Sequence, residues 1–239
     1  MIRVTVWNEN LHERTIPEIK AVYPDGIHGE IASIFKDDKN IEVKCVTMDM
    51  ENQGLSRELL ENTDVLIWWS HALNDEVTDE NAAMVSEFIM RGMGFVALHS
   101  AHMCKVLRRI LGTTMTLKWR DNDSERIYVT APSHPIASGI PEYFDLPHEE
   151  MYGEYFDIPK PDDVIFTGWF KGGCVFRSGV TFSRGSGKIF YFQPGHEEFP
   201  IYRNPIIRKI IKNAVNWAAP TDGAILDAQR DNIMLPKEF

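Results

Sequence analysis

The order of hydrophobic and polar positions indicates that strands and helices alternate in the first half of the chain. Short apolar runs have the length and the β-branched or aromatic content of strands, and they lie at 2–7, 41–47, 64–69 and 95–99. Apolar positions repeated every three to four residues, or capping signals, predict helices at 26–37, 56–61, 79–91 and 102–111. Such alternation is typical of βαβ units, so we expect an α/β fold with a mostly parallel sheet.

The pattern changes after Gly112. Strand-like runs then follow one another without intervening helices, at 126–130, 163–170, 174–182 and 188–193. This order predicts antiparallel pairing in a hairpin-rich second half. The segment RGSGK (184–188) is interpreted as a hairpin turn, and Pro205 is expected to open a last helix over 205–218.

Length and composition fit one globular domain. With 239 residues and 44% hydrophobic residues, the chain can bury a substantial core, and we expect a single α/β domain over 1–220. The stretch 113–163 is kept within that domain, and 221–239 is interpreted as a C-terminal extension.

Charge and motifs exclude several classes of partner. The formal net charge of -10 disfavours nucleic acid as a partner. No apolar run reaches the ~20 residues of a membrane span, and no leader peptide is evident, so a cytoplasmic protein is expected. The three cysteines do not form a disulfide pattern, and Cys45 fits a buried strand position. RGSGK lacks the spacing of a phosphate-binding loop, so no nucleotide cofactor is expected.

Candidate chemistry gathers where the predicted parallel strands end. Ligands of open α/β sheets bind at the carboxyl ends of the strands, where strand order reverses. Four strand ends carry polar or titratable residues: Asn8, Glu9, His12, Ser70, His71, His99, Ser100, His102, His196, Glu197 and Glu198. Each histidine alone fits a structural role, but their convergence on one edge predicts a site that binds something polar or charged. Asn8, Glu9, Glu154 and Glu198 are candidates for binding substrate, whereas His28 and His134 are interpreted as structural.

The segment GFVALHSAHM (94–103) has the layout of a nucleophile elbow, although it lacks the G-x-S-x-G motif. An apolar strand leads into a turn of small residues, and a helix follows. His99 occupies the turn. An alternative makes the next residue, Ser100, a hydrolase nucleophile with His99 or His196 as its base.

The segment HEEMYGEYF (148–156) is dense in carboxylates and aromatic residues. Glu150 or Glu154 is a candidate general base or metal ligand. The alternative is a solvated loop in which Tyr152 and Phe156 pack on the sheet. Trp69, at a strand end, is the candidate for stacking on a sugar ring, and Arg177 and Arg184 are further candidates for holding a polar substrate.

Three segments together resemble the trehalose-utilisation (ThuA-like) family: GFVALHSAH, DVLIWWSHALNDEVTDE and YFQPGHEEFPIYRNPIIRKIIKNAVNWA. The resemblance implies a flavodoxin-like, class I glutamine amidotransferase-like fold, a three-layer sandwich. In that superfamily a cysteine at the elbow works with a His-x-Glu after the last strand. His196 and Glu198 match the second element, but His99 replaces the cysteine. The thiolate that attacks an amide is therefore missing, and glutamine hydrolysis is not expected.

A histidine at the elbow, facing His196 and also His71 or His12, makes a nitrogen-rich site suited to zinc or a similar divalent ion. The leading hypothesis is an enzyme that acts on trehalose-related or keto-sugars, with His99 and His196 as ligands or as an acid/base pair. The alternatives are a Ser100-dependent hydrolase and a non-catalytic sugar-binding or assembly module. Because amidotransferase-like domains commonly associate, a homo-oligomer is also expected.

Overall fold

The computed structural model describes residues 1–221, so the predicted C-terminal extension lies outside the described residues from position 222 onward. The described strands form one nine-stranded sheet in the order β2-β1-β3-β4-β9-β8-β7-β5-β6. Their bounds are β1 Ile2–Asn8, β2 Ile41–Thr47, β3 Val65–Trp69, β4 Gly94–Leu98, β5 Lys118–Val129, β6 Tyr143–Gly153, β7 Asp163–Phe170, β8 Val175–Arg184 and β9 Gly187–Phe192.

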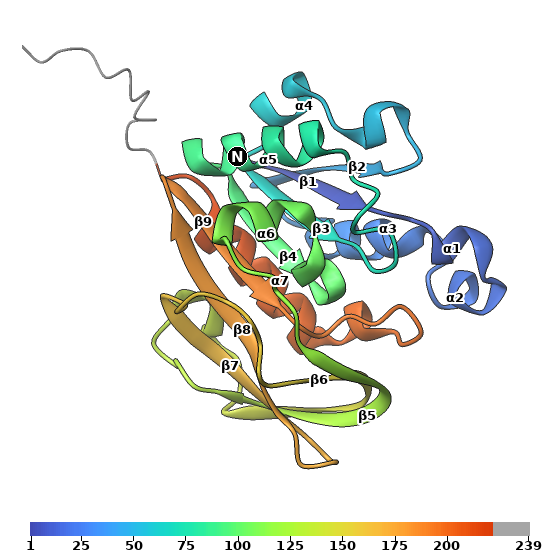
Figure 1. The fold of residues 1–239 in the computed structure, drawn as a ribbon, viewed down its shortest axis with the longest axis vertical. Helices are drawn as coiled ribbons and strands as arrows, with labels where there is room; N and C mark the ends of the chain where they lie inside the picture. The colour runs from blue at the N-terminus through green and yellow to red at the C-terminus, as the bar shows by residue number, and fades with distance from the viewer. Residues whose placement is uncertain (222–239) are drawn as a thin grey trace, which may run out of the picture.

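The sheet has a parallel part and an antiparallel part. Strands β2, β1, β3, β4 and β9 run parallel to their neighbours in that group. Strands β8, β7, β5 and β6 pair antiparallel, and β8 joins them to β9. Figure 1 shows β5 to β8 as an extension of the sheet beside the parallel strands and their helices. The predicted change from parallel to antiparallel pairing after Gly112 is confirmed.

Seven α-helices lie among the described residues: α1 His12–Thr15, α2 Pro17–Val22, α3 Gly26–Ala32, α4 Arg57–Glu61, α5 Asp79–Arg91, α6 Lys105–Leu111 and α7 Pro205–Ala218. The sequence accounts for their ends. Thr78 accepts a hydrogen bond from the amide of Asn81 at the start of α5, and Gly92 follows its last residue. Asn204 caps α7, and Pro205 occupies its first turn.

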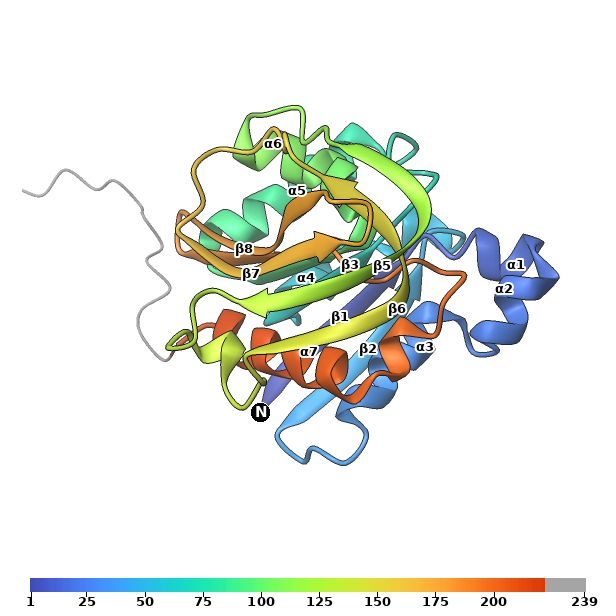
Figure 2. The same ribbon diagram turned by 90° about the horizontal axis from the view of Figure 1, so that it is seen from below.

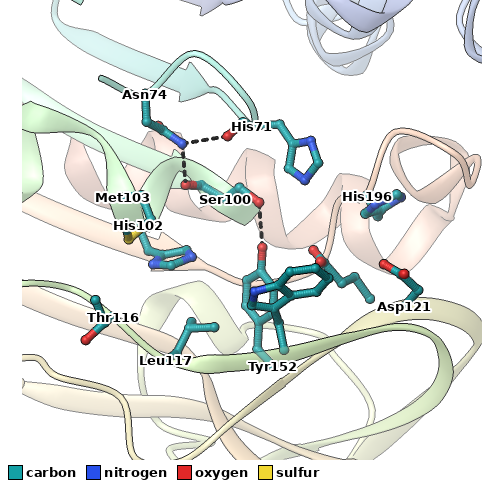
Figure 3. Close-up of a pocket in the computed structure, with 12 residues that line it drawn as sticks. His71, Asn74, Ser100, His102, Met103, Thr116, Leu117, Asp121, Tyr152 and His196 are labelled. Atoms are coloured by element: carbon teal, nitrogen blue, oxygen red, sulfur yellow. Dashed lines mark hydrogen bonds between the residues drawn. The ribbon is translucent and has the colours of Figure 1, made fainter. Parts of the chain in front are cut away.

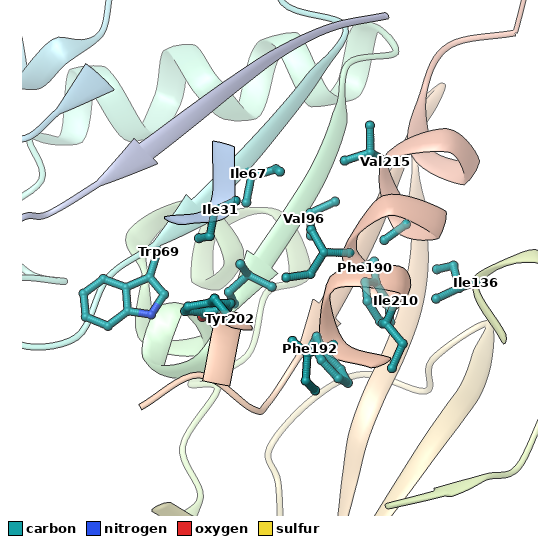
Figure 4. Close-up of a cluster of buried hydrophobic side chains, with 14 of the residues drawn as sticks. Ile31, Ile67, Trp69, Val96, Ile136, Phe190, Phe192, Tyr202, Ile210 and Val215 are labelled. Carbon is teal, nitrogen blue, oxygen red and sulfur yellow. The ribbon is translucent and has the colours of Figure 1, made fainter. Parts of the chain in front are cut away.

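Helices cover both faces of the parallel part, which gives the predicted three layers (Figure 2). On one face, α3 and α7 pack on alternate residues of the strands, with Ile31, Val96 and Ile210 in one cluster (Figure 4). On the other face, α5 and α6 pack against the cluster that contains Trp68 and Phe95. Because the strands bury both faces, they read as continuous apolar runs in the sequence.

Three local predictions need correction. The expected helix 26–37 is α3 followed by a 3-10 turn, Ser33–Phe35. The expected helix 102–111 starts only at Lys105, because His99–Met103 forms another 3-10 turn. HEEMYGEYF is not a solvated loop over its first six residues, since they belong to β6 and mostly face the interior.

The helices α1 and α2, with no clear apolar stripe in the sequence, were not predicted. Within residues 1–221, no helix combines the length and apolar character needed to cross a bilayer.

Candidate functional site

His99 stands at the turn that follows β4. Its φ of 56° lies in the left-handed region, which a residue with a side chain adopts at a cost of about 1–3 kcal/mol. Nδ1 lies 3.0 Å from the carbonyl oxygen of Gln193, just past β9, and therefore carries the ring proton. Nε2 is left facing the Glu150 carboxylate, whose Oε2 is 3.2 Å away. The turn thus acts as the predicted elbow, with an imidazole at its tip.

Four side chains from separate segments converge at this point. His71 follows β3, His99 follows β4, His196 follows β9, and Glu150 lies in β6. One ligand atom from each lies within 4.8 Å of the others. The ring centroid of His71 is 5.7 Å from that of His99 and 5.4 Å from that of His196. We call these four residues the histidine centre.

The histidine centre contains buried polar atoms without hydrogen bonds. His99 Nε2 and Glu150 Oε2 have no hydrogen-bond partner among the described residues. A buried polar atom left unpaired costs about 1–3 kcal/mol, so such atoms gathered at one point favour a bound group that pairs with them. Three imidazoles and one carboxylate are a donor set that zinc and similar divalent ions accept. The residues present therefore fit a divalent cation.

The charges of the centre depend on strong coupling between His99 and Glu150. Burial disfavours the charged ring of His99, but the neighbouring carboxylate outweighs it and raises the pKa of His99 to about 9. Burial opposes ionisation of Glu150, yet His99 keeps its pKa below the ordinary value. Burial lowers the pKa of His196 to about 4, so that this ring is neutral at pH 7. His196 Nδ1 accepts a 3.3 Å hydrogen bond from the amide of Glu198.

The carboxylate of Glu197 contacts the rings of three histidines. Its Oε1 is 2.6 Å from His12 Nδ1 and 3.0 Å from His71 Nδ1, and its Oε2 is 3.9 Å from His196 Nε2. The side chain is only 3% exposed. Burial raises its pKa, but the hydrogen bonds of His12 and His71 outweigh burial and hold it well below the usual range. A carboxylate on the far nitrogen of a histidine is the arrangement that orients metal ligands.

Glu149 fixes the turn that carries His196. The carboxylate accepts hydrogen bonds from the amides of Gly195, at 3.0 Å, and His196, at 3.1 Å. Burial raises the pKa of Glu149 to about 7. Gly195 is required here, because a Cβ would lie 2.0 Å from the hydroxyl oxygen of Tyr202 and 3.2 Å from His99 Cβ. The close approach of this turn to the elbow brings His196 and His99 together.

Two expected substrate-binding residues instead hold the backbone. Glu9 accepts hydrogen bonds from the amides of His71, Ala72 and Leu73, at 2.7, 2.9 and 3.0 Å, and is 2% exposed. Asn8 is fully buried and donates to the Glu13 carboxylate at 2.7 Å. The structure therefore does not support direct substrate binding by Glu9 or Asn8.

The other expected contacts also lie away from the pocket. Trp69 is fully buried and donates from Nε1 to the carbonyl of Gly195, so no face of its indole is free for a sugar. Glu154 pairs with Arg177 at 2.8 Å. Glu198 is exposed, and its buried neighbour Glu197 is the carboxylate that meets the histidines. Arg184 donates to the carbonyl of Ile110 instead of reaching the site.

Ser100 is 6% exposed, and its Oγ lies 2.5 Å from the hydroxyl oxygen of Tyr152. No imidazole of the described residues makes a hydrogen bond with this oxygen. The ring of Tyr152 stacks on His99, with centroids 5.3 Å apart and planes 15° apart. The geometry needed for a Ser–His nucleophile is therefore absent from the described residues.

A cavity of about 380 Å³ opens beside the histidine centre (Figure 3). Its volume lies within the roughly 300–1,000 Å³ of small-molecule sites. The lining residues come from both parts of the sheet and comprise His71, Asn74, Ser100, His102, Met103, Thr116, Leu117, Trp119, Asp121, Glu150, Tyr152 and His196. His102 donates from Nδ1 to the carbonyl of Met115, and burial lowers the pKa of His102 to about 4.

Sequence reasoning missed the roles of Glu149, Tyr152 and Trp119. Glu149 and Tyr152 lie in the carboxylate- and aromatic-rich segment that drew attention, but nothing in it showed which side chains face inward. Trp119 received no functional prediction from the sequence, yet it is 62% exposed at the cavity. The available signal was its position within the charged run KWRDND, which no buried strand would carry.

Comparison with solved structures defines the class of fold. The chain is similar to a ThuA-like protein from Parabacteroides merdae, with 15% identity, a TM-score of 0.69 and coverage of 93% of this chain and 92% of that chain. It is also similar to a cytoplasmic protein from Salmonella typhimurium, with 13% identity, a TM-score of 0.64 and coverage of 92% and 100%. For PurLQS from Thermotoga maritima the values are 13%, 0.54, 90% and 98%. The fold is that of the class I glutamine amidotransferase-like, flavodoxin-type proteins.

The family follows from the sequence. The family model ThuA, described as trehalose utilisation, matches residues 3–218. The chain therefore belongs to the ThuA family. No curated protein matches it.

Proposed function

We propose that the protein is a metal-dependent enzyme that acts on a trehalose-related or keto-sugar, with a divalent ion such as zinc held by His71, His99, Glu150 and His196. The observation that carries the proposal is the convergence of these four donors, two of which present a buried atom without a hydrogen bond. Membership of the ThuA family supports the sugar substrate. The cavity next to the centre provides room for it.

Each residue of the centre has a role that follows from its contacts. Because His99 Nδ1 donates a hydrogen bond to the carbonyl of Gln193, Nε2 is the ring nitrogen that would coordinate the metal. Glu197 keeps the proton on Nδ1 of His71 and so presents Nε2 of that ring. Glu150 supplies the negative charge. A divalent ion in this set would polarise a sugar oxygen or acidify a bound water. His196 is neutral at pH 7, which is the form in which an imidazole coordinates a metal ion.

The thiol chemistry of amidotransferases has no support in this chain. Its elbow carries His99, and none of the three cysteines lines the cavity. Cys104 is fully buried, which raises the pKa of its thiol to about 12. The Ser100 hydrolase alternative is likewise unsupported, because the partner of Ser100 Oγ is a tyrosine hydroxyl.

Elemental analysis of the purified protein tests the proposal. We expect about one zinc, manganese or nickel ion per chain, and we expect it to disappear in His99→Ala and His196→Ala. The matched control is His134→Ala, because His134 caps a 3-10 turn away from the cavity. Turnover of trehalose and of its keto derivatives should be lost in the first two variants and kept in the control. Wild-type protein that remains metal-free after incubation with these ions would refute the metal site.

The same experiment separates an enzyme from a non-catalytic sugar-binding module. A binding module would retain affinity for the sugar, with no product formed in the presence of the metal. Product formation that a chelator abolishes and added zinc restores supports the enzyme.

A further inference from the structure

The cavity has two walls of different character. The histidine centre forms one of them, through His71, Glu150 and His196. Trp119 and Asp121, from the start of β5, line the cavity as well, and Figure 3 shows Asp121 beside His196. These two residues are not part of the histidine centre, and we call them the β5 wall.

Strand geometry explains why both residues of the β5 wall face the cavity. Side chains two residues apart on a strand point to the same face, so Trp119 and Asp121 share one side while Arg120 points to the other. Arg120 contacts Cys174 and also Asp123, which lies beyond an irregularity in the pairing of β5 with β6. Trp119 pairs with Tyr152 of β6, which carries the ring stacked on His99. This register places the indole next to the centre.

Trp119 is more exposed than the tryptophans of the parallel strands. Trp7, Trp68 and Trp69 are fully buried, whereas Trp119 is 62% exposed. A large aromatic face that is exposed in a small-molecule cavity offers a surface for a ligand ring, because stacking against it would remove apolar area from water. A pyranose ring presents C–H groups on its faces and hydroxyls at its edge, which suits an indole with a carboxylate two residues away.

The charge of the cavity selects among sugars. Asp121 and Glu150 contribute carboxylates, and no lysine or arginine is among the described residues that line the cavity. Asp121 is exposed and makes no hydrogen bond or ion pair within residues 1–221, so its oxygens are available to sugar hydroxyls. A phosphate group would meet negative charge on the β5 wall without a cationic side chain to bind it.

We propose that Trp119 and Asp121 form the binding surface for a neutral, non-phosphorylated pyranoside, with the ring stacked on the indole and a hydroxyl donating to the Asp121 carboxylate. This inference rests on the proposed function, since it locates the sugar at the same site. It adds the substrate class, because the β5 wall discriminates against phosphorylated sugars.

Calorimetric titration with trehalose, methyl α-glucoside and trehalose 6-phosphate tests this proposal, on protein with zinc and on protein treated with a chelator. Trehalose should bind wild-type protein at least roughly tenfold more tightly than Trp119→Ala or Asp121→Asn. Trp119→Phe should restore most of the affinity, because it keeps an aromatic face. The matched control is Trp169→Ala, which removes a 45% exposed indole outside the cavity and should leave affinity unchanged.

Three results would refute the β5 wall as a binding surface for a neutral sugar. They are binding of trehalose 6-phosphate as tightly as trehalose, equal losses of affinity in Trp119→Ala and Trp169→Ala, and no binding of either neutral sugar. Failure of the proposed function has a different signature. Protein that binds no metal and forms no product, yet binds trehalose through Trp119, would refute the enzyme and retain the binding surface.

Discussion

The parallel and antiparallel parts of the sheet contribute different chemistry to one site. The parallel part supplies imidazoles from the ends of β3, β4 and β9, where the fold brings strand termini to a common edge. The antiparallel part supplies Glu150, Tyr152 and the exposed Trp119 from within the paired strands β5 and β6. The edge where the parallel strands end thus provides nitrogen donors, and the β5–β6 hairpin adds a carboxylate and an exposed aromatic face to the same cavity. Neither part contains the whole site.

The largest effect is expected when the antiparallel part loses the carboxylate that it contributes to the site. Glu150→Gln keeps the volume and removes the charge that faces His99. If both parts are required, activity should fall by roughly 10²–10³-fold, as much as in His99→Ala, because the proposed metal site loses its negative charge. Steady-state turnover of the sugar and metal content measure the effect. Full activity in Glu150→Gln would show that the parallel part suffices.

Stability should depend on the loop that the parallel part uses to present His71. Glu9→Ala leaves the amides of His71, Ala72 and Leu73 without their acceptor. We expect the free energy of unfolding to fall by about 2–3 kcal/mol, from the loss of a buried charged acceptor. Urea denaturation followed by circular dichroism measures it. Glu42→Ala, at an exposed position of β2, is the control and should change stability by less than about 0.5 kcal/mol.

Glu197 tests whether residues that touch no substrate orient the imidazoles. Glu197→Gln should weaken metal binding by roughly 10–100-fold, because His12 and His71 lose the charged acceptor at Nδ1. Competition with a chelator of known affinity measures this change. The adjacent Glu198→Gln is a matched control, since Glu198 is exposed. Equal effects in the two variants would contradict the assignment of Glu197.

The smallest expected effect lies inside the antiparallel part. Glu125 is fully buried beside Ser178, whose hydroxyl donates to it at 2.7 Å, and burial raises the pKa of Glu125 well above its ordinary value. In the unfolded chain Glu125 loses its proton above pH ~4.5, whereas in the fold it keeps it, so this residue makes stability fall as pH rises.

Glu125→Gln should therefore gain stability relative to wild type at pH 8 and show little difference at pH 4. Urea midpoints at the two pH values measure the change. A wild-type advantage that grows with pH would contradict the raised pKa. The exposed Glu142→Gln, at the edge of the same strands, should show no such pH dependence.

The sequence by itself determined the alternation of strands and helices, the change to antiparallel pairing and the strand ends that carry histidines. These features depend on local periodicity and on residues that stop or cap an element, which neighbouring positions alone specify. His71, His99 and His196 were identified in this way, because the carboxyl ends of parallel strands must meet. The His-x-Glu resemblance, by contrast, pointed to Glu198, where the structure uses Glu197.

Only the tertiary structure decided which groups complete the site. The side chain of Glu150 faces His99 only in the observed register of β6 against β5, since a shift of one residue would turn it to the other face of the sheet. The exposure of Trp119 and the burial of Trp69 depend on which segments pack over each ring. The residues next to a tryptophan in the sequence do not specify those distant segments. Long-range pairing across some 30 residues sets these positions, so the chemistry of the antiparallel part emerges only with the fold.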